Sequence, residues 1–180
     1  MRRRARSRPG FSLVELLATI TVVGILGSLS STLIYSGVRS YHDASAQAQL
    51  HEDLSVALEK ITRVLRAIPA DPALPAPVPQ ISAVTPTSIA WGAGGMLRLD
   101  GAALRFQEPG GAERTLLGGV TEFAVRCYDE AGSALAGTLT AAEAQDVRRI
   151  EIKITAAAHG ATEMLRTRVF TRCTMEGAVP

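Results

Sequence analysis

Hydrophobic positions change their spacing twice along the chain. Residues 16–38 contain no charged side chain, and no later run resembles them. From residue 44 to residue 68 apolar side chains recur at steps of three and four, and beyond residue 80 they fall in short runs between turn residues. The pattern predicts an apolar helix of membrane length, an amphipathic helix and a β-rich domain, in that order.

The first apolar segment carries one charge. Residues 11–34 are about 24 residues long, so as a helix they span roughly 36 Å, enough for a bilayer core of ~30 Å. The single charge is Glu15, near the start of the segment. Residues 19–23 are poor helix formers in water, but in lipid the backbone must bond to itself and helix is expected. We therefore predict a transmembrane helix half at 11–38.

The second helix half, predicted at 39–68, has one apolar face. Its members are Leu50, Leu54, Leu58, Ile61, Leu65 and Ile68, with charged residues mostly on the remaining surface. This spacing is typical of a helix that packs one stripe on a core. No proline lies between residues 11 and 68. The simplest interpretation is one continuous helix of about 58 residues, roughly 87 Å long.

A proline-rich connector is predicted at 69–80, followed by a β-rich globular domain at 81–180. The expected strands are 81–84, 88–91, 96–99, 104–107, 114–117 and 120–128, and residues 140–145 read as a helical turn or loop. The last hairpin is the clearest, because Ile150, Ile152 and Ile154 alternate with polar residues before a turn at 159–160. The fold class is α+β, with a long N-terminal helix packed on a C-terminal antiparallel sheet.

Positive charge is concentrated at the start of the chain. Residues 1–10 contain five of the 19 basic residues and no acid, so removing them leaves 14 basic against 17 acidic residues, a charge of −3. The basic pI therefore belongs to this leader, and no nucleic-acid partner is predicted. By the positive-inside rule the arginines stay cytoplasmic, which places the C-terminal domain on the periplasmic or extracytoplasmic side of an inner membrane.

The segment Gly10-Phe-Ser-Leu-Val-Glu-Leu-Leu17 resembles the N-terminal cleavage and methylation motif of type IV prepilins and type II secretion pseudopilins. The resemblance is strong over residues 10–27. It implies cleavage after Gly10 by a prepilin peptidase, N-methylation of Phe11, and a docking role for Glu15 between subunits. It also implies a pilin-like fold and other pilin or pseudopilin subunits as partners. The order of elements loosely resembles minor subunits in the J-like and W-like positions.

The chemistry of these residues supports the implied roles. A glycine before the scissile bond leaves no Cβ to block a protease. Cleavage creates an amine at Phe11, and that amine and Glu15 are opposite charges in a zone of low dielectric constant. Pairing with a neighbouring subunit would offset both desolvation costs. A pair within one chain is also possible, because four helical residues rise only about 6 Å.

Residues for catalysis do not form a recognisable pattern. The three histidines stand near no candidate nucleophile, and the GxSxG, HExxH and phosphate-loop motifs are absent. We predict no enzyme, no cofactor and no metal, although Asp129-Glu130 could ligate calcium. Cys127 and Cys173 are expected to point inward and could form a disulfide worth roughly 4 kcal/mol for its loop of about 46 residues. Two buried thiols are the alternative.

Two functions remain open from the sequence. The first is a structural minor subunit, processed and assembled into a type IV pilus or a type II secretion pseudopilus. The alternative is a single-pass anchored or secreted periplasmic protein with its own binding or enzymatic activity, in which residues 1–31 are an ordinary signal or anchor. A mature chain that begins with methylated Phe11 distinguishes the first from the second, which predicts a start near Thr32 or an intact Met1.

Overall fold

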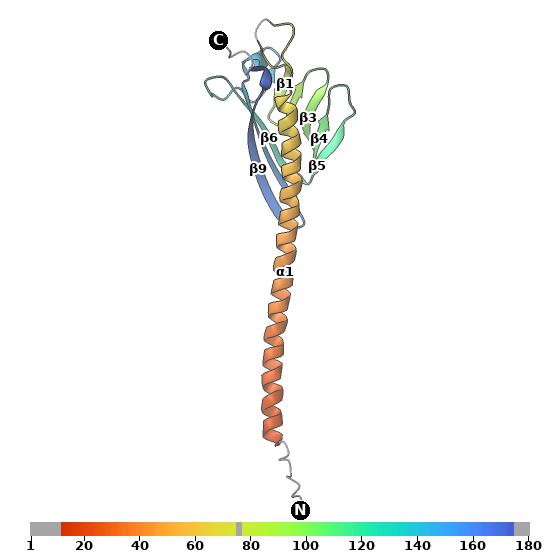
Figure 1. The fold of residues 1–180 in the computed structure, drawn as a ribbon, viewed down its shortest axis with the longest axis vertical. Helices are drawn as coiled ribbons and strands as arrows, with labels where there is room; N and C mark the ends of the chain where they lie inside the picture. Colours follow the sequence, from red (N-terminus) through yellow and green to blue (C-terminus); the bar gives the residue numbers. More distant parts are fainter. Residues whose placement is uncertain (1–11, 75–76, 175–180) are drawn as a thin grey trace, which may run out of the picture. The chain divides into compact units, whose positions relative to one another are not determined.

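The computed structural model describes residues 12–74 and 77–174 of the 180-residue chain. The chain divides into two compact units, residues 1–44 and 45–180. Helix α1 (Leu13–Arg66) contributes its first part to one unit and its second part to the other (Figure 1). The predicted α+β fold, with a long N-terminal helix packed on an antiparallel β domain, is confirmed.

The second part of α1 packs through the predicted stripe. Its buried side chains are Leu50, Leu54, Ala57, Leu58, Ile61 and Leu65. The helix ends at Arg66, two residues before the predicted end. Beyond it the chain forms one more turn, in which the amide of Ile68 donates to the carbonyl of Leu65 at 3.4 Å. Pro69 follows at once, and proline restricts the residue before it to extended conformations.

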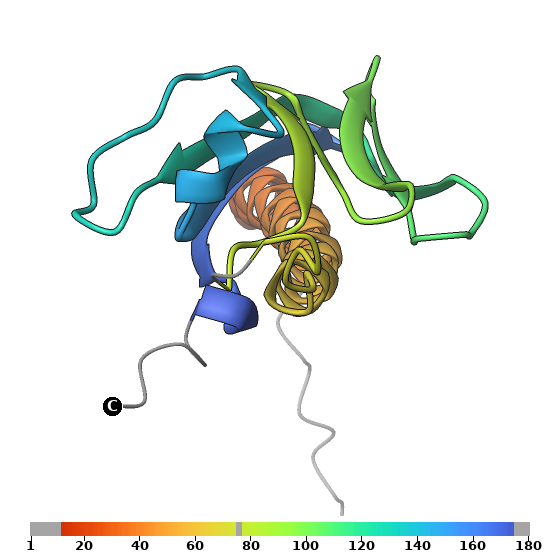
Figure 2. The same ribbon diagram turned by 90° about the horizontal axis from the view of Figure 1, so that it is seen from above.

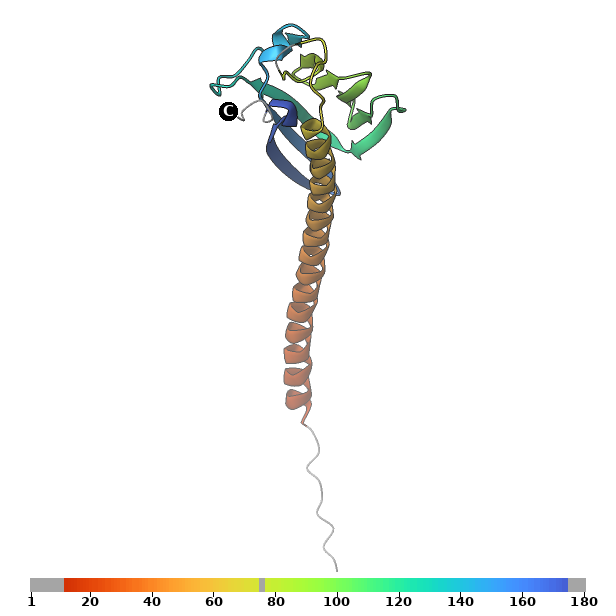
Figure 3. The same ribbon diagram turned by 45° about the horizontal axis from the view of Figure 1, so that its top comes forward.

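The globular unit contains two antiparallel sheets rather than one (Figure 3). The larger sheet has the strand order β5-β4-β3-β2-β1-β7, and the smaller has the order β6-β8-β9. The larger sheet consists of β1 (Ile81–Thr85), β2 (Ser88–Trp91), β3 (Gly95–Asp100), β4 (Ala103–Gln107), β5 (Arg114–Gly118) and β7 (Leu139–Thr140). Its first five strands pair in chain order, through short turns from β1 to β4 and a longer loop at 108–113 before β5.

The smaller sheet consists of β6 (Val120–Tyr128), β8 (Arg149–Ala158) and β9 (Ala161–Phe170). The short 3₁₀ helix η1 (Glu143–Asp146) precedes β8, and η2 (Arg172–Thr174) follows β9. His159 and Gly160 have φ angles of 51° and 84° and close the β8–β9 hairpin. Two consecutive positive φ angles in a two-residue loop define the type I′ turn that suits the right-handed twist of a hairpin.

One core joins the sheets to the helix. Figure 2 shows the strands curving around one side of the C-terminal part of α1. The largest fully buried side chains come from all three layers and include Leu54, Ile61, Phe106, Ile150 and Ile152. Trp91 and Phe106 stack with ring centroids 6.4 Å apart. The burial of alternate residues in β8 and of every third or fourth residue in α1 explains why both periodicities appear in the sequence.

Candidate processing and docking site

Ser12 begins α1 and fixes the position of Glu15. The hydroxyl oxygen of Ser12 accepts a hydrogen bond from the amide of Glu15 at 3.3 Å, and its carbonyl accepts one from the amide of Leu16 at 3.1 Å. Ser12 is thus the N-cap and Glu15 the third helical residue, the spacing of a capping box. Glu15 therefore stands in the first helical turn, where the helix dipole favours a negative charge.

The predicted cleavage and methylation residues, Gly10 and Phe11, lie outside the described residues. The carboxylate of Glu15 is exposed and makes no ion pair within residues 12–74 and 77–174. The docking role of Glu15 therefore stays a prediction.

An apolar surface surrounds this end of α1. Every residue from 12 to 45 is exposed, and fifteen of those side chains are large and hydrophobic, among them Leu13, Val23 and Leu33. Among the described residues α1 is the one helix long and apolar enough to cross a membrane, and its most apolar stretch is not buried within the chain. Five hydroxyl side chains in this part donate to carbonyls three or four residues earlier: Thr19, Thr21, Ser28, Thr32 and Ser36. Their polarity is therefore satisfied within the helix, as lipid requires.

The two cysteines are separate in the structure. Cys127 and Cys173 are both free and buried, which is the alternative that the sequence left open. Burial raises the pKa of Cys127 to about 12. The predicted disulfide is not formed in this structure, and it stays a prediction for mass analysis under non-reducing conditions.

No group of three or more histidine, cysteine or acidic side chains suitable for a metal occurs in the part of the chain that the structure describes. Asp129, considered above for calcium, closes its own loop instead. Its carboxylate accepts a hydrogen bond from the amide of Ser133 at 2.7 Å, and its amide donates to the carbonyl of Ser133 at 3.1 Å.

A buried carboxylate in β8 is the feature that the sequence did not indicate. Glu151 is only 4% exposed, although it alternates with the buried isoleucines. Arg166 and Arg168 donate to its carboxylate at 2.5 and 2.6 Å, and the hydroxyl of Tyr128 donates at 3.2 Å. Burial alone would raise the pKa of Glu151, but the hydrogen bonds from the two guanidinium groups hold it below its ordinary value. The two arginines are half exposed and bind this carboxylate.

Comparison with known families gives one match. Residues 5–31 match the model of the prokaryotic N-terminal methylation motif. The match covers residues 5–10 of the predicted leader, the helix cap, Glu15 and the first part of the apolar segment. It fits a type IV pilin or pseudopilin, a structural family, and supports a protein processed at its N-terminus. Together with the apolar helix it fits a single-pass membrane-anchored protein. A comparison with curated proteins gives no match.

Proposed function

We propose that this chain is the precursor of a structural minor subunit of a type IV pilus or a type II secretion pseudopilus. In this proposal a prepilin peptidase cleaves after Gly10 and methylates the new N-terminus, Phe11. The observation that carries the proposal is the methylation motif at residues 5–31, continued by a helix whose apolar surface is covered by none of the described residues. The minor role in a J-like or W-like position rests on the order of elements alone.

Glu15 is the residue that would dock the mature subunit. A carboxylate in a membrane helix costs roughly 2.5–3.5 kcal/mol at the bilayer centre and less near an interface. The amine that cleavage exposes at Phe11 is the nearest source of positive charge in the sequence, and the same amine on a neighbouring subunit would fix the axial register of packed helices. Ser12 supports this role, because its cap holds Glu15 in the first turn of α1.

Orientation follows from charge. The five arginines of residues 1–10 would stay on the cytoplasmic side of the inner membrane, where the peptidase cuts, and the globular unit would be extracytoplasmic. After cleavage the subunit would leave the bilayer for the filament. The chain itself is proposed to catalyse no reaction.

The test is to express the full chain with and without a prepilin peptidase and to determine the N-terminus by mass spectrometry. The proposal predicts a mature chain that starts at Phe11 and carries one added methyl group, only when the peptidase is present. A chain that keeps its arginine-rich leader, or that starts near Thr32, would contradict it and favour an ordinary anchor or signal sequence.

A second experiment isolates Glu15. The variant Glu15→Gln should still be cleaved but should not enter filaments assembled in a host that carries the remaining subunits, as judged by immunoblotting of sheared filaments. Thr21→Val is the matched control, because it removes a polar group from the same exposed segment without removing charge. Equal incorporation of both variants would show that Glu15 has no docking role.

A further inference from the structure

The strand β9 forms an open edge of the smaller sheet. In the order β6-β8-β9 it has a partner on one side only. A two-residue type I′ loop is closed by a hydrogen-bonded residue pair, here Ala158 and Ala161, and hydrogen-bonded pairs then alternate along the hairpin. The backbone groups that point away from β8 are therefore those of Thr162, Met164, Arg166, Arg168 and Phe170. No other described strand pairs with them.

The same five residues also present exposed side chains. Met164 is 54% and Phe170 43% exposed, and within the described part of residues 45–180 only Val56 is a further exposed large hydrophobic residue. Of the side chains of β9 that face the core, Val169 is buried, and the others, such as Leu165, are only half-buried. Apolar and arginine side chains together on an exposed strand are typical of a protein interface.

Positive charge predominates on the outer face of this sheet. The strand register places Arg126, Glu151 and Arg168 in one row across it, and Lys153 and Arg166 in the next. With Arg149 the face carries five cationic side chains against the two carboxylates of Glu122 and Glu151. Glu122 binds Lys153, and Glu151 binds the two arginines of β9. The face keeps an excess of three positive charges, whereas the chain without residues 1–10 has a charge of −3.

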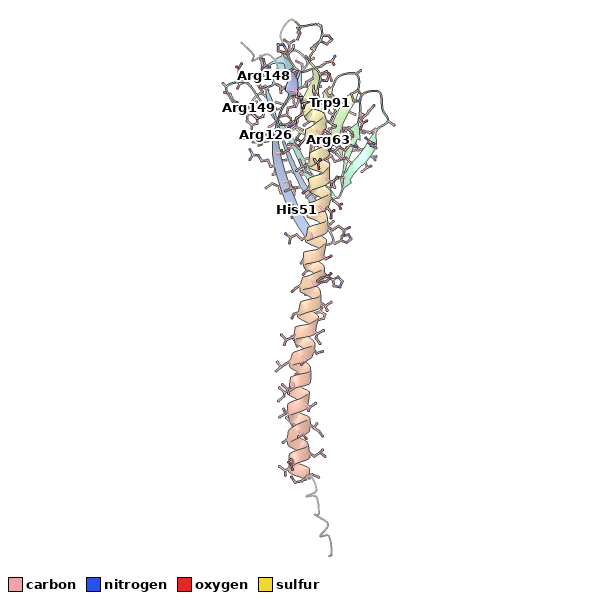
Figure 4. The ribbon with its side chains drawn as sticks, viewed as in Figure 1. His51, Arg63, Trp91, Arg126, Arg148 and Arg149 are labelled. Carbon is pink, nitrogen blue, oxygen red and sulfur yellow. The ribbon has the colours of Figure 1, made fainter. Side chains whose placement is uncertain are left out.

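Arg126 is the cation of this face that is free to bind a partner. It makes no ion pair or hydrogen bond with any described residue, and Figure 4 shows it on the side of the globular unit where β6, β8 and β9 lie. Charged side chains on an edge strand normally protect it from pairing. Here the guanidinium groups of Arg166 and Arg168 point toward Glu151 of β8, away from the open edge. They therefore leave the outward N–H and C=O groups of β9 accessible.

We propose that β9 binds an extended, carboxylate-bearing segment of a different protein subunit by strand addition. The partner backbone would bond to the outward groups of β9, its carboxylates would lie on the basic face nearest Arg166 and Arg168, and its apolar side chains would lie on the opposite face beside Leu165. Strand addition obtains affinity from main-chain hydrogen bonds and specificity from alternate side chains. This inference goes beyond the proposed function, because it needs neither cleavage after Gly10 nor assembly.

The test uses the full chain in detergent micelles and a short synthetic peptide of alternating glutamate and valine, with binding measured by fluorescence anisotropy. Two further peptides carry N-methyl groups, one on the glutamate amides and one on the valine amides. In an added strand only alternate amides point toward β9, either those of the glutamates or those of the valines. One methylated peptide should therefore bind about tenfold or more weakly, while the other retains its affinity. Equal binding of all three would overturn the proposal, and so would equal binding of a lysine–valine peptide.

Charge recognition is tested separately with Arg126→Glu. This variant should weaken binding of the glutamate peptide by about threefold or more at low salt, since it lowers the excess positive charge of the face from three to one. Arg114→Gln is the control, because Arg114 lies on β5 of the other sheet and binds Glu108. Equal effects of the two variants would overturn the role of the basic face. Dimerisation of the chain that the peptide reverses would overturn the assignment to a different protein. Because the peptide assay needs no processing, its failure leaves the proposed function intact.

Discussion

Replacing Glu151 by glutamine should destabilise the globular unit much more than the same substitution at Glu122. Glu151 is buried and accepts three hydrogen bonds, two of them from arginines. A hydrogen bond to a charged group contributes about 1.5–3 kcal/mol. The glutamine oxygen can still accept one of these hydrogen bonds. Both arginines are half exposed, so their freed N–H groups can bond to water. We therefore expect a net loss of about 2 kcal/mol in the free energy of unfolding. Glu122 pairs with Lys153 at a site where both side chains are at least a third exposed, and its substitution should cost about 0–1 kcal/mol.

The assay is urea unfolding of the full chain in detergent, followed by the fluorescence of Trp91. This is the single tryptophan of the chain, and it is 2% exposed, so its emission reports on the core of the globular unit. The difference in unfolding free energy follows from the shift in midpoint at constant slope. A variant Glu151→Gln that unfolds at the midpoint of the wild type, or at that of Glu122→Gln, would refute the reasoning.

The same variant should change the response to acid. The pKa of Glu151 lies below its ordinary value of 4.5 in the folded chain, so the unfolded chain binds more protons near that pH. The stability that Glu151 contributes is therefore fully present above pH 4.5 and is lost as the pH falls through the lower, folded pKa. Glu151→Gln removes this contribution at every pH, so the difference between wild type and variant should shrink as the solution is acidified. A difference that grows in acid would contradict the assigned direction of the pKa shift.

Three further outcomes are expected. Leu54→Ala should cost about 2–5 kcal/mol because Leu54 is fully buried, whereas Val56→Ala, at a site 63% exposed, should cost little, both measured by urea unfolding. Gly119→Ala should destabilise more than Gly110→Ala in thermal unfolding. Both glycines have positive φ, but a Cβ at Gly119 would lie 2.7 Å from a backbone carbonyl oxygen, while Gly110 has open space. Native Cys127 should resist a thiol reagent at neutral pH and react after unfolding, because its pKa is raised to about 12 by burial; fast native labelling would contradict that burial.

The sequence predicts most of the fold because its periodicities are local. The stripe of α1 and the alternation in β8 each follow from burial of one face, and the turn at His159-Gly160 is encoded by two adjacent residues. The strands at 88–91 and 120–128 have the predicted bounds. The division into two sheets was not predicted, because strand order depends on pairings between residues distant in the chain.

The candidate sites also differ in whether their signal is local in the sequence or depends on contacts between distant residues. The motif around Glu15 is a local signature and could be found from the sequence. The cluster around Glu151 could not, because alternation alone places a polar residue of β8 on a solvated face. Only the pairing of β8 with β9 brings Arg166 and Arg168 to it. Cys173 was expected to point inward and is buried, but the strand ends at Phe170 and Cys173 lies in η2, so strand alternation does not determine its direction.

The exposed apolar surface of the first part of α1 limits the environments that this segment can occupy. Within the described residues the apolar side chains of 12–45 pack against nothing else in the chain, so contact with water is unfavourable for them. From synthesis onward this apolar surface is expected to be covered by lipid acyl chains, by another protein or by neighbouring helices. If the chain moves from a bilayer into a filament, as proposed, these side chains should pass directly from lipid to neighbouring helices without an intermediate exposed to water.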